Sequence, residues 1–121
     1  MQTQSTVLTI FMMPLLAVLY GCQPEEPTQQ ITKGNPEAAG AMKLAKDIGC
    51  FACHSIDKKL LGPAWKHVAA INRGNPDAEA RLMNKIAKGG SGVWGKIDMP
   101  AYPNLSEADL STLVKFILSL E

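Results

Sequence analysis

The hydrophobic pattern is clearest at the C-terminal end of the chain, where apolar residues recur with helical spacing. Between residues 107 and 118 they fall three and four positions apart, on one face of an amphipathic helix. Ser106-Glu107-Ala108-Asp109, just before them, is similar to a capping box, so we predict that the helix begins there. The residues of this inward face are Leu110, Leu113, Val114, Ile117 and Leu118.

Two further segments open with the same helix-start signal, an Asn followed by Pro and an acidic residue. We predict helices over residues 35–48 and 75–88, each ended by a glycine. A shorter helix is predicted over residues 64–71. No segment shows the alternation of a strand, so the fold class is all-α, with three to four short helices. The inward positions expected on the two longer helices are Met42, Ala45, Ile48, Leu82, Met83 and Ile86.

The N-terminal end has a different pattern. Residues 7–20 form an apolar run of fourteen, whereas a membrane-spanning helix needs roughly 20 apolar residues. Such a run is typical of a secretory signal, and we interpret residues 1–21 as a signal peptide. It closes on Leu19-Tyr20-Gly21-Cys22, which resembles the lipobox of bacterial lipoproteins and implies a lipid on Cys22. Tyr20 departs from that pattern, so an ordinary signal cleaved nearby is the alternative.

Residues 22–36 contain prolines, glutamines and charged residues, with Ile31 as their one large apolar side chain. This composition buries too little surface to fold, so we predict a flexible tether after Cys22. Residues 37–121 are then the one folded domain. They hold eleven Lys or Arg against nine Asp or Glu, a balance too mild for a nucleic-acid binder. A domain this small has a thin core and usually needs a staple.

The segment GCFACHSID contains Cys50, Cys53 and His54 and admits three interpretations. A thioredoxin-type dithiol follows a strand, whereas this motif follows a predicted helix. A structural zinc ion needs four ligands; His67 would have to join these three, and the adjacent Cys53 and His54 fit one ion poorly. The spacing Cys-x-x-Cys-His is the attachment motif of c-type haem, in which two thiols bond the porphyrin edge and the histidine ligates iron. We favour haem, which would also supply the missing core.

A second iron ligand is sought elsewhere in the chain. Met99 lies 45 residues after His54, in a predicted loop before Pro100. Met42 and Met83 occupy apolar helical positions, where methionine usually fills a core. His67 follows His54 by only thirteen residues, which makes the opposite face of a haem hard to reach. We favour Met99, with ligation by His67 or an open position as the alternatives.

These features together resemble the short monohaem class I cytochromes c of bacteria, the cytochrome c-551 type. The resemblance covers residues 37–121 through four stretches in order: GCFACHSID, LGPAWKHVAA, IAKGGSGVWGKIDMP and LSEADLSTLVKFILSL. It implies thioether bonds from Cys50 and Cys53, iron ligation by His54 and Met99, and a hydrogen bond from the His54 ring to the Pro63 carbonyl.

The resemblance also implies roles near the haem propionates. Trp94 would donate its indole N–H to a propionate, and Lys85 occupies a place where the family often has a basic residue. Relatives commonly carry an Asn three residues after the methionine, but this chain has Tyr102 there, and Asn104 is the candidate replacement. The glycines that would let the backbone pass close to the macrocycle are Gly89, Gly90, Gly92 and Gly95.

With both axial positions filled, a haem has no place for a substrate, so the sequence favours electron transfer over catalysis. We expect a monomeric electron carrier of a respiratory chain, on the periplasmic side and anchored through Cys22 or soluble, with protein redox partners and no small-molecule substrate. A weak positive rim for an acidic partner is expected from Lys58, Lys59, Lys66, Lys88 and Lys96. The alternatives are an electron-entry subunit of one oxidoreductase and a gas-binding or peroxidatic haem protein.

Overall fold

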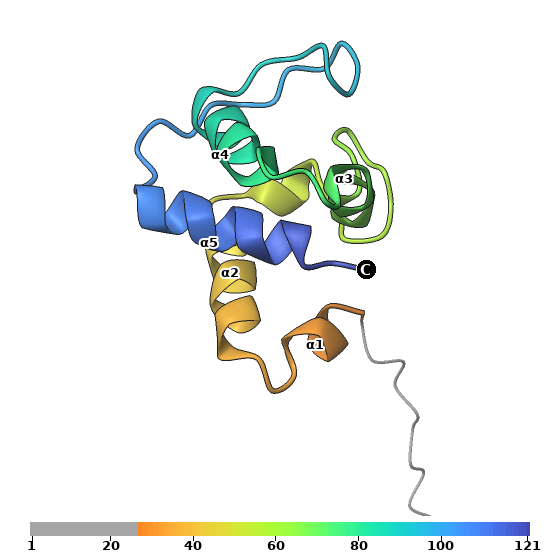
Figure 1. The fold of residues 1–121 in the computed structure, drawn as a ribbon, viewed down its shortest axis with the longest axis vertical. Coiled ribbons are helices and arrows are strands. Elements are labelled where there is room, and N and C mark those ends of the chain that lie inside the picture. Colours follow the sequence, from red (N-terminus) through yellow and green to blue (C-terminus); the bar gives the residue numbers. More distant parts are fainter. Residues whose placement is uncertain (1–26) are drawn as a thin grey trace, which may run out of the picture.

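The computed structural model describes residues 27–121, and its regular elements are all helical (Figure 1). Within that range no strand forms, and the one β-bridge pairs Gly90 with Met99. The predicted all-α class is therefore confirmed. The elements are α1 (Pro27–Thr32), α2 (Pro36–Asp47), the 3-10 turn η1 (Cys50–Ala52), α3 (Trp65–Asn72), α4 (Ala78–Lys88) and α5 (Glu107–Leu118).

Helix α5 is the central element, and α2, α3 and α4 all pack against it. Its apolar face is buried as predicted, except that Leu118 is only half-buried. Phe116 and Leu120, which the helical pattern did not single out, are buried as well. The Trp65 ring of α3 meets the Phe116 ring edge-on, with centroids 6.1 Å apart. The C-terminal helix and the residues after it therefore bury more apolar side chains than the predicted face alone contains.

The two Asn-Pro signals lead to different structures. Asn35 caps α2 as predicted, because its side-chain oxygen accepts from the backbone N–H groups of Glu37 and Ala38, at 3.1 Å each. Asn75 was expected to start the next helix, but α4 begins three residues later. The Asn75 side chain accepts from the N–H of Asp77 at 2.9 Å and closes a local turn. An Asn side chain stabilises either arrangement, so the sequence signal alone did not distinguish them.

Part of the segment predicted as a flexible tether is helical. Within residues 22–36, α1 spans Pro27–Thr32 and packs against α2, and the half-buried Ile31 contacts the core. Figure 1 shows α1 folded back beside the start of α2. Ile31 is the large apolar side chain of this helix that packs against the core. The predicted signal peptide and Cys22 lie outside the described residues, and no helix within residues 27–121 is long and apolar enough to cross a membrane.

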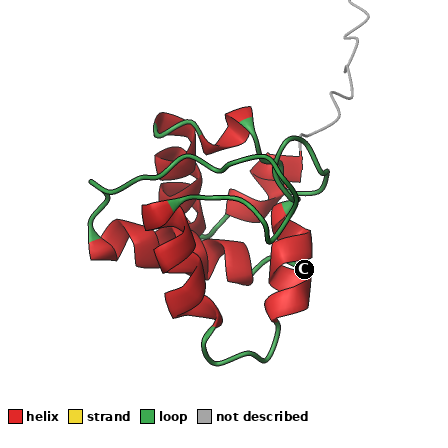
Figure 2. Cartoon of the chain, turned by 90° about the horizontal axis from the view of Figure 1, so that it is seen from above, coloured by secondary structure: helices red, strands yellow, loops and turns green. Residues whose placement is uncertain are grey.

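One buried polar side chain joins α3 to α4. Asn72 is 5% exposed; its amide donates to the Val68 carbonyl at 2.8 Å, and its oxygen accepts from the Arg81 guanidinium. These bonds satisfy a group whose burial would otherwise be costly. Long loops follow η1 and α4, and Figure 2 shows them crossing the helical body as irregular backbone. Between these loops and the helices lies a cavity.

Candidate functional site

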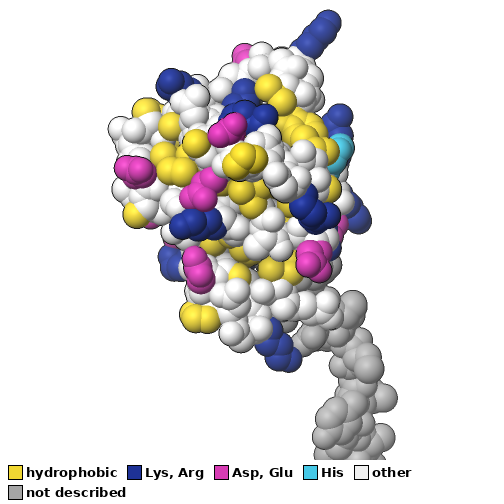
Figure 3. Space-filling view, in the orientation of Figure 1, with side chains coloured by type: hydrophobic (Ala, Val, Ile, Leu, Met, Phe, Trp, Pro, Cys, Tyr) yellow, Lys and Arg dark blue, Asp and Glu magenta, His cyan; other side chains and the backbone are white. Residues whose placement is uncertain are grey.

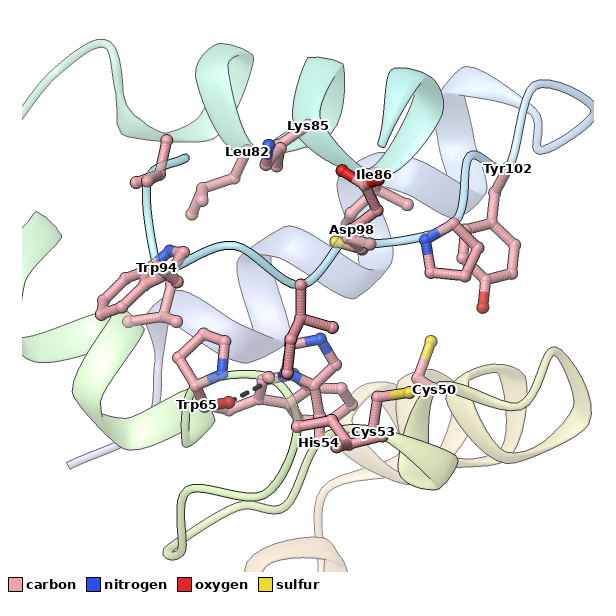
Figure 4. Close-up of a pocket in the computed structure, with 18 of the residues that line it drawn as sticks. Cys50, Cys53, His54, Trp65, Leu82, Lys85, Ile86, Trp94, Asp98 and Tyr102 are labelled. Carbon is pink, nitrogen blue, oxygen red and sulfur yellow. Dashed lines mark hydrogen bonds between the residues drawn. The ribbon is translucent and has the colours of Figure 1, made fainter. Parts of the chain in front are cut away.

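The cavity lies between α4 and the loop after it on one side and η1 and His54 on the other (Figure 4). Its volume is about 310 Å³, within the range of sites that hold organic ligands and cofactors. Leu113 and Ile117 of α5 form part of its wall, so the central helix contributes to both the core and the site. Its other large aliphatic side chains are Leu61, Val68, Leu82, Ile86, Val93 and Ile97.

His54 lies in the cavity wall with a fixed ring orientation. Its Nδ1 lies 2.9 Å from the carbonyl oxygen of Pro63, the contact expected from the sequence (Figure 4). A carbonyl only accepts, so Nδ1 carries the proton and the lone pair is on Nε2. Gly62 lies against the same ring: a Cβ atom there would come within 2.8 Å of both ring nitrogens. The imidazole is thus held in the tautomer that binds a metal through Nε2.

Cys50 and Cys53 lie beside His54, at the two ends of the turn η1 (Figure 4). Gly49 adopts a positive φ of 83° and turns the chain from α2 into this motif. The two thiols are free, half-buried and part of the cavity lining. Burial raises the pKa of the Cys50 thiol, and burial likewise raises the pKa of Tyr102, with smaller contributions from both cysteines. The Cys50 thiol is therefore protonated near neutral pH.

Met99 reaches the cavity from the loop after α4. Its backbone pairs with Gly90, with N–H to carbonyl distances of 2.9 and 3.3 Å. Gly89 lies so close to this segment that a Cβ atom would come within 2.9 Å of the Pro100 backbone. Met42 is buried in the core and Met83 packs against it, and neither lines the cavity. The structure thus places Met99, among the three, in the same cavity as His54.

Three further predicted residues, Lys85, Trp94 and His67, differ in whether they line the cavity. Lys85 and Trp94 line it, but the Lys85 ammonium donates to the carbonyls of Gly89 and Gly90, at 3.2 and 2.9 Å. The Trp94 ring meets His67 edge-on, with centroids 5.2 Å apart. His67 is exposed and outside the lining.

The loop after Met99 differs from the expectation for Asn104. That residue is exposed and does not line the cavity, whereas Tyr102 does. Sequence reasoning noted Tyr102 as a departure from the pattern, but did not place it in the site. Its position follows from a hydrogen bond of its N–H to the Ile86 carbonyl, at 3.1 Å, which ties this part of the loop to α4.

The residues present fit a haem attached through two cysteines. The cavity is apolar, with two thiols beside an imidazole that has a free Nε2 lone pair and a thioether in the opposing loop. Zinc is a poorer fit, since within residues 27–121 no group of three or more His, Cys, Asp or Glu side chains is arranged so that it could hold a metal ion. Fold and site together define a small helical protein of the covalent-haem class.

The chain belongs to the cytochrome c family. The family model "Cytochrome c" matches residues 29–121. Cytochrome c-551 of Allochromatium vinosum is 42% identical over 85 residues, which cover 70% of this chain and 90% of the relative. Cytochrome c-551 of Pseudomonas aeruginosa is 51% identical over 77 residues, covering 63% of this chain and 72% of the relative.

Solved structures agree with this assignment. The crystal structure of wild-type Nitrosomonas europaea cytochrome c552 matches with a TM-score of 0.62 and 45% identity, over 66% of this chain and 99% of that one. The class 1 cytochrome MtoD of Sideroxydans lithotrophicus matches with a TM-score of 0.61 and 36% identity, over 71% and 96%. As a cytochrome c, the chain carries one covalent haem c and acts as an electron carrier.

Proposed function

We propose that this chain is a carrier of single electrons whose haem is bonded to Cys50 and Cys53 and ligated by His54 and Met99. The observation that carries the proposal is that one cavity contains all four side chains, with His54 on the wall opposite the Met99 loop. A His/Met pair raises the potential of a bound haem, whose iron gains and loses one electron. The protein orients His54 through Pro63 and excludes water with its aliphatic wall.

Export and a lipid anchor on Cys22 form a second part of the proposal. The sequence supports them through the apolar run of residues 7–20 and the lipobox-like ending. A carrier on the periplasmic side, anchored in this way, would meet protein redox partners of the respiratory chain in the same membrane. The anchor is tested by metabolic labelling with a radioactive fatty acid, which should mark the wild-type protein and leave Cys22→Ser unlabelled.

The surface charge favours weak electrostatic steering toward an acidic partner. Lys58 and Lys59 are exposed beside the Cys-x-x-Cys-His segment, whereas Lys66 is paired with Asp57 at 2.8 Å. On the face drawn in Figure 3, basic and acidic side chains are interspersed and form no single patch. Partner choice would then rest on shape and apolar contact as much as on charge.

The axial ligands are tested by spectroscopy of protein produced in a host that matures c-type haems. We expect a sharp reduced c-type band and, in the oxidised protein, the weak long-wavelength band of sulfur-to-iron charge transfer. Met99→Ala should lose the long-wavelength band and allow the reduced protein to bind carbon monoxide. Met83→Leu is the matched control, since Met83 does not line the cavity, and it should keep the band.

The outcomes separate the parts of the proposal. Colourless protein would refute haem attachment at Cys50 and Cys53. Haem without the sulfur band in the wild type, or with a band that survives Met99→Ala, would refute ligation by Met99. Carbon monoxide binding by the wild-type reduced protein would instead favour an open-site haem protein and contradict the carrier role.

A further inference from the structure

We propose that Lys85 is a positioning residue for Met99. Lys85 lies in the last turn of α4, is half-buried, and lines the cavity. Its ammonium does not extend into solvent; it donates to the carbonyls of Gly89 and Gly90. The backbone of those two glycines contacts the segment that contains Met99. The inference builds on the proposed ligation by Met99.

The contact between the glycines and Met99 is direct. Gly90 and Met99 exchange two backbone hydrogen bonds, and they form the one β-bridge of the described chain. Gly89 approaches the backbone of residues 99–101 so closely that a Cβ atom would come within 2.8 Å of the Ala101 N–H nitrogen. A shift of the Gly89–Gly90 turn would therefore move the backbone of Met99, and its sulfur with it.

The Gly89–Gly90 turn lies directly after the end of α4. Carbonyls in the last turn of a helix lack intrahelical partners, and a positive side chain there also meets the negative end of the helix dipole. Gly89 leaves α4 with a φ of 67°, so the helix cannot continue and supply the missing N–H groups. The Lys85 ammonium donates to the Gly89 carbonyl and is a second donor to the Gly90 carbonyl, which also accepts from the Met99 N–H. A charged donor in a half-buried position makes a strong hydrogen bond.

Lys88 provides a matched comparison on the same helix. It also lies in the last turn of α4, carries the same charge and is exposed, but the structure shows no bond from its ammonium to either glycine. Any effect of general charge or of helix propensity should thus appear in both residues. An effect on the position of Met99 should appear in Lys85 alone.

The test measures how readily the methionine is displaced. Oxidised holoprotein is titrated with imidazole, and loss of the sulfur-to-iron band reports exchange of the methionine for the added ligand. Lys85→Met keeps the length of the side chain and removes its donors, and we expect imidazole to bind about tenfold more tightly. Lys85→Arg restores a charged donor and should recover most of the wild-type affinity. Lys88→Met should change the affinity by less than about twofold.

The reduction potential, measured on the same variants, identifies the competing role. An unchanged imidazole affinity in Lys85→Met, with a lowered potential, would overturn the inference and assign Lys85 to a haem propionate. Equal effects of Lys85→Met and Lys88→Met would overturn it in favour of a general charge effect. A wild-type protein without the sulfur band would overturn both the inference and Met99 ligation, whereas a normal wild-type band with no response in Lys85→Met overturns the inference alone.

Discussion

At the scale of single residues, two neighbours of His54 fix the orientation of its ring. Pro63 presents a carbonyl that fixes the proton on Nδ1, and Gly62 lacks the atom that would collide with the ring. Neither residue has a chemically reactive side chain. Together they hold the His54 ring in the orientation that a metal ligand needs. Residues that contact metal ligands commonly have this role.

The role of Gly62 is tested by Gly62→Ala. The added Cβ atom would overlap the His54 ring, so the ring must move away from Pro63. We expect a loss of about 1–3 kcal/mol in the free energy of unfolding of the holoprotein, with a shifted reduction potential. Guanidinium unfolding followed by absorbance measures the first, and redox titration the second.

The matched control is Gly40→Ala, because Gly40 is exposed and lies in the middle of α2. Nothing lies within 4 Å of a Cβ atom there, so alanine should stabilise the helix by about 0.5–1 kcal/mol. A Gly62→Ala protein as stable as the wild type, with an unchanged potential, would show that the ring has room to adjust and that Gly62 does not constrain it.

The residues of the site differ in how far the sequence reveals them. Cys50, Cys53 and His54 lie in one short segment of sequence, and their Cys-x-x-Cys-His spacing indicates haem attachment. Lys85 was noticed only through the resemblance, and its bonds to Gly89 and Gly90 depend on how the chain leaves α4. Such contacts are set by the path of a loop, which residue periodicity does not encode.

At the scale of helices, the hydrophobic pattern located the ends of α2, α3 and α5 to within one or two residues. It placed the start of α4 three residues too early. Helices with a strong apolar face are encoded locally, but a start signal such as Asn75-Pro76 is compatible with both a cap and a turn. The bond between Asn72 and Arg81 was also missed, because it joins two helices whose relative placement comes from tertiary packing.

The link between α3 and α4 is tested by Arg81→Ala. This change removes the donor to the buried Asn72 oxygen, and water can replace it only in part. We expect a loss of about 1 kcal/mol in the free energy of unfolding, which for a domain of this size lowers the melting temperature by about 4–8 °C. Calorimetry of the holoprotein measures it.

Arg73→Ala serves as the comparison, since Arg73 is exposed just after α3 and has the same charge. Its effect should stay within about 0.5 kcal/mol. If both variants lose the same stability, the link contributes nothing specific. If the double variant Asn72→Leu with Arg81→Ala regains stability over Arg81→Ala, the unsatisfied oxygen is the cause.

At the scale of the whole molecule, charge is nearly balanced, with a formal net charge of +1. Local charge near the site therefore decides any steering. Lys58 and Lys59 are exposed next to the haem-attachment segment, and Leu60 and Leu61 follow them with about half of each side chain accessible, at 49% and 57%. This segment combines positive charge with apolar surface beside the cavity.

Steering is tested with small inorganic oxidants of opposite charge. Oxidation of the reduced holoprotein by hexacyanoferrate(III), an anion, should slow by about twofold to fivefold as salt rises from low to physiological levels, because the local positive field is screened. Oxidation by the cationic tris-phenanthroline cobalt(III) should not slow. Stopped-flow absorbance measures both rates.

The double variant Lys58→Gln with Lys59→Gln should flatten the salt dependence with the anion. Lys33→Gln, which removes an exposed charge next to α1, is the control and should leave it intact. Equal salt dependence for the two oxidants would mean that no positive field surrounds the haem-attachment segment.

The seating of α1 on the domain has a consequence for an anchored carrier. With Pro27–Thr32 folded against α2, four residues separate Cys22 from the first helical residue. The five Cα–Cα steps from Cys22 to Pro27 span at most about 18 Å in any conformation. A carrier attached at Cys22 would be confined to a thin layer above the bilayer. Its effective concentration toward partners in the same membrane would rise as that layer becomes thinner, while partners farther from the surface would be out of reach. In a carrier anchored at Cys22, six residues of helix would thus limit which proteins it can meet.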